Sequence, residues 1–164
     1  MTTPESPSET DADADAALHR RFGSACNNRG WALADRPERT ADEDRELLDT
    51  AHAAAWHWSR VGTELQRRRA AMLVCQAHAA LRLGGAPALE AATVLRDWFL
   101  ARDDTPDWER AFAHLVHANA AAAADDAPAH GDSWQRSEAA IAAIADDEDR
   151  AIVLVAFASV PKPA

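Results

Sequence analysis

Several residue types are missing or rare in this chain of 164 residues, and each absence narrows the class of protein. Tyrosine is absent, glycine occurs only 6 times, and no run alternates apolar with polar residues over a strand's length, which disfavours a β-sheet fold. The two cysteines, Cys26 and Cys75, lie far apart without metal-ligand spacing. A disulfide between them remains an alternative, but nothing suggests a secreted, disulfide-rich scaffold.

Long apolar segments are also lacking. No apolar run approaches the roughly 20 residues that a membrane helix needs, and the start of the chain lacks the basic and apolar stretches of a signal peptide. We therefore expect a cytoplasmic protein that does not bind membranes. Lysine occurs once beside sixteen arginines, a usage that suggests a GC-rich bacterial coding bias.

Alanine dominates what is present. Apolar residues make up 48% of the chain, and much of that share is alanine, the best helix former and a residue that lets helix axes approach closely. The composition predicts an all-α fold. Residues 1–10 contain no large apolar side chain beyond Met1 and are expected to form a disordered tail, with a single helical domain over 11–164.

Start and stop signals divide the domain into seven helices. Thr40 with Glu43 forms a capping-box pattern, and Thr63 begins another helix after the stop at Gly62. Apolar spacing and further signals place the helices at 12–34 (with a break near 27–30), 41–61, 64–83, 87–102, 106–124, 134–145 and a short last segment ending near 159. Residues 125–132 are predicted to be a loop.

The last segment is apolar all round, so it is expected to be buried or to cover a neighbouring helix; a strand over 151–157 is the competing interpretation. Short turns between the helices force neighbours to run antiparallel. The fold is therefore predicted to consist of antiparallel helix hairpins, arranged either as a closed bundle or as a short right-handed solenoid.

Two local patterns resemble known families. The stretch from Ala79 to Ala92 is similar to the central turn of a tetratricopeptide repeat, in which one helix ends in Leu-Gly and the next opens with Glu-Ala. The segments 37–40, 51–54, 57–58 and 61–63 resemble a family of small uncharacterised bacterial proteins that carry Ala-His-Ala-Ser, His-Trp and Val-Gly-Thr at this spacing. The resemblance implies a tetratricopeptide-like helical fold and supplies no established chemistry.

Charge is distributed unevenly along the chain. The net charge is −10, which disfavours binding to nucleic acids. Residues 51–100 nevertheless carry a net charge of +3, from six arginines against three acids. An arginine cluster brackets the turn at Gly62 and comprises Arg60, Arg67, Arg68 and Arg69. Guanidinium groups suit carboxylates and phosphates, so the cluster favours an acidic partner; pairing with nearby acids of this chain is the alternative.

The histidines provide the second candidate chemistry. His114 and His117 are three residues apart on one helix and could ligate one metal, with His78 or His57 as a third ligand. No metal motif of recognised spacing is present, and no nucleophile elbow, phosphate loop or dinucleotide fingerprint occurs. We therefore assign no catalytic residue, no metal ligand and no cofactor.

These observations favour a non-enzymatic interaction module whose groove binds a peptide or protein partner, for which the arginine cluster suggests an acidic character. The predicted groove residues are Trp56, His57, Arg60, Arg67, Arg68 and His114. A helical metal-binding protein or small-ligand enzyme that uses histidines is the alternative, and a homodimer is also open.

Overall fold

The computed structural model describes residues 9–163, with side chains from Ala12 onward, and all regular secondary structure in that range is helical. The all-α prediction is confirmed. The seven helices of the described range are α1 (Glu9–Ala34), α2 (Ala41–Val61), α3 (Glu64–Ala80), α4 (Gly85–Leu100), α5 (Asp107–Ala123), α6 (Ala127–Ala142) and α7 (Asp147–Phe157). Most of the tail expected over residues 1–10 lies outside the described residues.

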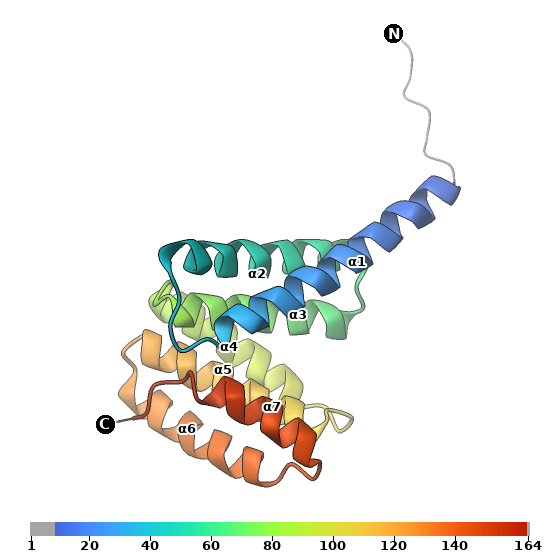
Figure 1. Ribbon diagram of the computed structural model, residues 1–164. Helices are drawn as coiled ribbons and strands as arrows, with labels where there is room; N and C mark the ends of the chain where they lie inside the picture. Colours follow the sequence, from blue (N-terminus) through green and yellow to red (C-terminus); the bar gives the residue numbers. More distant parts are fainter. Residues whose placement is uncertain (1–8, 164) are drawn as a thin grey trace.

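The helices follow one another down an elongated molecule. Figure 1 shows α1 and α2 at one end, α6 at the other, and α7 beside α5 and α6. Each helix from α1 to α6 packs on its neighbour in sequence, and α3 also packs directly on α5. Helix α3 therefore joins the α1–α2 hairpin to the α5–α6 hairpin.

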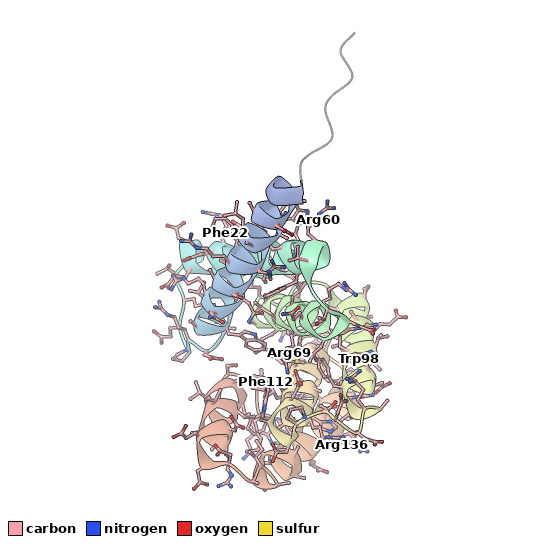
Figure 2. All side chains as sticks on the ribbon, turned by 90° about the vertical axis from the view of Figure 1, so that its right-hand side faces the viewer. Phe22, Arg60, Arg69, Trp98, Phe112 and Arg136 are labelled. Atoms are coloured by element: carbon pink, nitrogen blue, oxygen red, sulfur yellow. The ribbon has the colours of Figure 1, made fainter. Side chains whose placement is uncertain are left out.

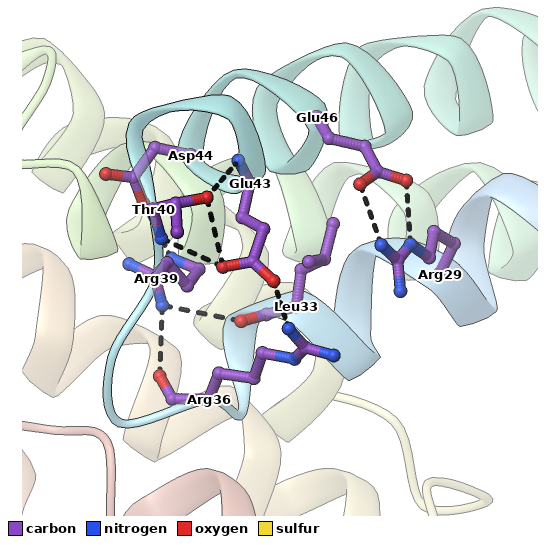
Figure 3. A network of polar contacts seen from close by, with 8 residues as sticks. All are labelled: Arg29, Leu33, Arg36, Arg39, Thr40, Glu43, Asp44 and Glu46. Carbon is purple, nitrogen blue, oxygen red and sulfur yellow. Dashed lines mark hydrogen bonds and ion pairs between the residues drawn. The ribbon is translucent and has the colours of Figure 1, made fainter.

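Helix α2 begins with the capping box that the sequence predicted, and two ion pairs join it to the end of α1 (Figure 3). The Thr40 backbone N–H donates to Glu43 Oε2 at 2.8 Å, and the Glu43 N–H donates to Thr40 Oγ1 at 3.3 Å. Arg36 pairs with the same glutamate, and Arg29 forms a two-pronged ion pair with Glu46. These contacts tie the end of α1 to the first turns of α2.

The break expected near residues 27–30 is wrong, because α1 is continuous to Ala34. Its glycines serve close packing instead. A Cβ on Gly30 would lie 2.7 Å from Leu73 Cδ2, and one on Gly23 would lie 3.0 Å from the Trp58 ring. The absent side chains let α1 lie against α2 and α3, so packing outweighs the weak helix propensity of glycine.

Helix α3 ends three residues before the predicted residue 83. Arg82 adopts a positive φ of 52°, and the Leu83 N–H donates to His78 O at 2.7 Å, a turn that satisfies the last carbonyls of the helix. The end of α5 repeats this geometry at Asp125, with φ 57°. The side chains of Arg82 and Asp125 form an ion pair at 2.8 Å, which connects the two helix ends.

Near the C-terminus one prediction is wrong, whereas the last segment covers its neighbours α5 and α6, one of the two arrangements expected for it. The expected loop over 125–132 is mostly helical, because Asp126 caps α6 by accepting from the Ala129 N–H and Pro128 fits the first turn. Helix α7 is buried on one side only, through Val153 and Ala156. Its other side is exposed at Ile152, Leu154 and Val155.

The core consists of two clusters that meet at α3. The first contains Leu33, Leu47 and Leu73, and the second contains Phe99 and Leu115 together with residues of α6 and α7. None of the described helices is long and apolar enough to cross a membrane.

Candidate functional site

The six residues predicted to line one groove lie in three different places. Trp56 is 58% exposed, and its ring packs against the imidazoles of His19 and His57, with centroid distances of 5.1 and 4.8 Å. His57 Nδ1 lies 2.9 Å from His19 Nδ1, and partial burial together with His19 lowers the pKa of His57. Trp56 and His57 therefore belong to a surface shared by α1 and α2.

The arginines that flank Gly62 are largely engaged within the chain. Arg67 donates to the Gly62 carbonyl at 2.6 Å. Arg68 pairs with Glu64 at 3.3 Å, and its guanidinium carbon lies 5.4 Å from the centroid of the Trp98 ring. Arg60 is exposed at the end of α2, near the same end of the molecule as Phe22 in Figure 2. Arg68 lines a cavity of about 640 Å³ between α2, α3 and α4, and neither Arg60 nor Arg67 lines it.

His114 lies on α5, where Arg96 of α4 and Arg136 of α6 are close enough to influence its pKa. Burial, followed by the positive charges of Arg96 and Arg136, lowers its pKa. Its Nδ1 atom is buried without a hydrogen-bond partner among the described residues. The structure therefore does not bring His114 together with Trp56 or the Gly62 turn.

The other member of the predicted metal pair, His117, is occupied by hydrogen bonds. Its Nδ1 lies 2.7 Å from Ser133 Oγ, and its Nε2 lies 2.9 Å from Thr93 Oγ1 and 3.1 Å from an Arg96 nitrogen. Burial lowers the pKa of this imidazole to about 4. Among residues with described side chains, no three His, Cys, Asp or Glu residues group as metal ligands. Ser133 is buried, so we interpret its hydrogen bond with His117 as one that stabilises the packing of α6 on α5.

Another cavity lies where α1, α3, α5 and α7 meet. It has a volume of about 240 Å³. Its apolar walls are Trp31, Met72, Trp108, Phe112 and Ile152, and its polar lining is Asn27, Asp35, Arg69 and Glu109. Figure 2 shows Arg69 and Phe112 near each other at the middle of the molecule.

The aromatic rings of this cavity stand nearly perpendicular to each other. The Trp31 and Phe112 centroids are 5.2 Å apart at 70°, and those of Trp108 and Phe112 are 6.1 Å apart at 86°. The i, i+4 spacing of Trp108 and Phe112 places both on one face of α5. The arrangement forms an aromatic corner with Trp31 of α1 as its third member.

An ion pair between the partly exposed Arg69 and the buried Glu109 lies beside the aromatic corner. Arg69 donates from Nε and Nη2 to the two carboxylate oxygens of Glu109, at 2.6 and 3.1 Å. Glu109 is 1% exposed, and the Arg69 guanidinium carbon also lies 5.5 Å from the Trp108 ring centroid. The pair connects α3 to α5 and neutralises the glutamate charge.

Asp35, at the end of α1, has no such partner. Its Oδ1 atom is buried without a hydrogen bond among the described residues. Burial raises the pKa of this carboxyl from 3.8 to about 6. At neutral pH, Asp35 therefore carries most of an uncompensated negative charge at the edge of an aromatic cavity.

Two further cavities adjoin this one. A polar cavity of about 270 Å³ shares Asn27 and Arg69 with it, and is also lined by Ser24, Asn28, Trp58 and Gln66. A third, also of about 270 Å³, shares Trp108, Phe112 and Ile152 and adds Asp149 and Val153. The first cavity thus shares wall residues with each of the other two, and we call the surface formed by the three cavities the central groove.

Sequence reasoning missed the central groove, although two signals pointed to it. Glu109 lies on the same helical face as Phe112 and Val116, and Asp35 follows Trp31 by four residues; both are acids on an apolar stripe. Arg69 belonged to the arginine cluster, but its partner is Glu109, forty residues away.

No protein-family model matches the chain, and neither do the curated proteins or the solved structures compared with it.

Proposed function

We propose that this protein is a non-enzymatic interaction module that binds a peptide segment of a partner protein in the central groove. The observation that carries the proposal is that three cavities lined by α1, α2, α3, α5 and α7 lie side by side and share wall residues. Each measures about 240 to 270 Å³, below the roughly 300–1,000 Å³ typical of pockets for small molecules. Pockets of this size suit single side chains of a bound peptide.

The chemistry of the walls supports this occupant. The aromatic corner offers a site for one large side chain, the kind of anchor that contributes most of the energy at peptide interfaces. The polar cavity presents the amides of Asn27, Asn28 and Gln66, which both donate and accept hydrogen bonds and so match a peptide backbone.

The arrangement of the helices supports the same class of function. Consecutive antiparallel hairpins, joined by the Leu-Gly turn after α3, are the architecture of tetratricopeptide-like arrays, whose surfaces bind extended segments. In this proposal the groove replaces the surface expected at Trp56 and Arg60, because Arg67 and Arg68 are engaged within the chain.

Selection from a random peptide library displayed on phage tests the proposal. The wild-type protein should enrich related sequences, and Ile152→Glu should lose the selected peptides because it places a charge on the shared wall of two cavities. Ile152 is 61% exposed, so this substitution should leave the fold intact.

Val155→Glu is the matched control. Val155 is 54% exposed on the same helix and lines none of the three cavities. It should retain the selected peptides. Equal loss in both variants, or no enrichment with the wild type, would contradict the proposed groove.

A further inference from the structure

The aromatic cavity also indicates what kind of side chain enters it. Resting on the proposed function, we infer that the anchor is a basic side chain, a lysine or an arginine, whose stem packs on Trp31, Trp108 and Phe112 and whose cationic end pairs with Asp35. The partner is thus a peptide with a positively charged anchor, in contrast to the acidic partner expected from the arginine cluster.

The rings supply the first part of the argument. Aromatic faces carry partial negative charge and attract cations within about 6 Å of the ring centroid. Trp31 and Trp108 each stand nearly perpendicular to Phe112, and all three rings line the cavity. The chain already uses this property here, because the Arg69 guanidinium lies over Trp108.

The balance of charge supplies the second part. Arg69 and Glu109 cancel each other through two hydrogen bonds, so Asp35 determines the net charge of the cavity lining. Asp149 adds a second carboxylate at the α7 end of the groove. Both unmatched charges are negative, and a cationic group in the cavity would complement them.

The state of Asp35 supplies the third part. A partly buried carboxylate with an unbonded oxygen is unfavourable for the folded protein unless something pairs with it. The same carboxylate beside a bound ammonium gains a charge-assisted hydrogen bond in a partly desolvated site. Asp35 is therefore placed as the positioning group for the cationic end of the anchor.

Three small probes with one common stem test the inference: hexylamine, hexanol and hexanoate, which are cationic, neutral and anionic at pH 7.5. Binding is followed by NMR from the indole N–H signals of Trp31 and Trp108, assigned with tryptophan-to-phenylalanine variants. The amine should bind at least about tenfold more tightly than the alcohol, as one charge-assisted hydrogen bond implies. Hexanoate should bind most weakly.

Two variants locate the effect. Asp35→Asn should reduce the preference for the amine to about that for the alcohol while retaining alcohol binding. Asp49→Asn makes the same charge change on the exposed surface of α2, outside the groove, and should leave the preference unchanged.

The outcomes separate this inference from the proposed function. Equal binding of all three probes would overturn the basic anchor while leaving an apolar peptide groove in place. Tighter binding of hexanoate would assign Arg69, not Asp35, as the recognition group. If no probe moves the Trp31 and Trp108 signals, the cavity takes no such anchor and the inference fails; the peptide selection then decides the proposed function independently.

Discussion

Asp35→Asn is expected to stabilise the protein at neutral pH, because it removes a charge that the folded state holds without a partner. Burial raises the pKa of this carboxyl from 3.8 to about 6. A shift of about two pH units corresponds to about 3 kcal/mol, at 1.36 kcal/mol per unit. Asp35 is only half-buried, so screening by solvent reduces this ceiling to about 1–2 kcal/mol.

The sign of the pH dependence follows from the direction of the shift. The folded-state pKa lies above the unfolded value, so the stability linked to this carboxyl is fully present below about pH 3.8 and is lost as the pH rises through about 6. The advantage of Asp35→Asn should therefore be largest above pH 7 and vanish near pH 4.

Urea unfolding of wild type and variant between pH 4 and pH 8, followed by tryptophan fluorescence, measures this difference. The free energies of unfolding should diverge as the pH rises. A variant that is less stable than wild type at pH 7, or a difference that does not change with pH, would refute the account of Asp35. Added stability together with lost preference for an amine would mark a residue kept for binding.

Three further perturbations test other parts of the structure. Arg69→Met should reduce stability by about 3 kcal/mol because it leaves the buried Glu109 without a partner, and the double variant with Glu109→Leu should recover much of that loss. Urea unfolding of the full double-mutant cycle measures the coupling between the two residues. Additive effects of the two substitutions would contradict the ion pair. The pKa of His117 is lowered to about 4, so the stability linked to this imidazole is present above pH 6.5 and is lost as the pH falls through about 4. His117→Gln should therefore reduce the fall in the free energy of unfolding between pH 6.5 and pH 4. An unchanged fall in the variant would contradict this. Gly30→Ala should lower the stability by about 1–3 kcal/mol because its Cβ would lie 2.7 Å from a methyl group of Leu73. Gly131→Ala should raise the stability by about 0.5–1 kcal/mol, because Gly131 lies inside α6 and its Cβ would meet no atom within 4 Å. Thermal unfolding of the two variants checks these opposite signs.

The local features of the fold could be predicted because their causes lie within a few residues. The capping box at Thr40 depends on Glu43, three residues ahead, and forms as expected; Thr63 begins α3 as expected and also forms a capping box with Gln66. The helical class likewise follows from composition. The loop prediction over 125–132 was wrong because Asp and Pro are common both in loops and at helix starts, and here Asp126 and Pro128 begin α6.

Features set by tertiary packing were out of reach of the same reasoning. Gly30 looks like a helix breaker in sequence, and only the position of Leu73 on another helix explains it. The central groove has the same origin, since Trp31, Arg69 and Trp108 come from three helices. Asp35 has no basic partner in the cavity because Arg69 pairs with Glu109. That pair joins residues forty positions apart, so no local sequence pattern predicts it.

The chain's 6 tryptophans provide the most direct test of the central claim that peptides bind in the central groove. Each indole N–H gives a separate NMR signal, and three of the rings, those of Trp31, Trp58 and Trp108, line the groove. Addition of a library-selected peptide should shift the signals of these three rings and leave that of the exposed Trp56 in place. A shift at Trp56 with no change at Trp31 and Trp108 would contradict the account and return the binding surface to the outer face of α1 and α2.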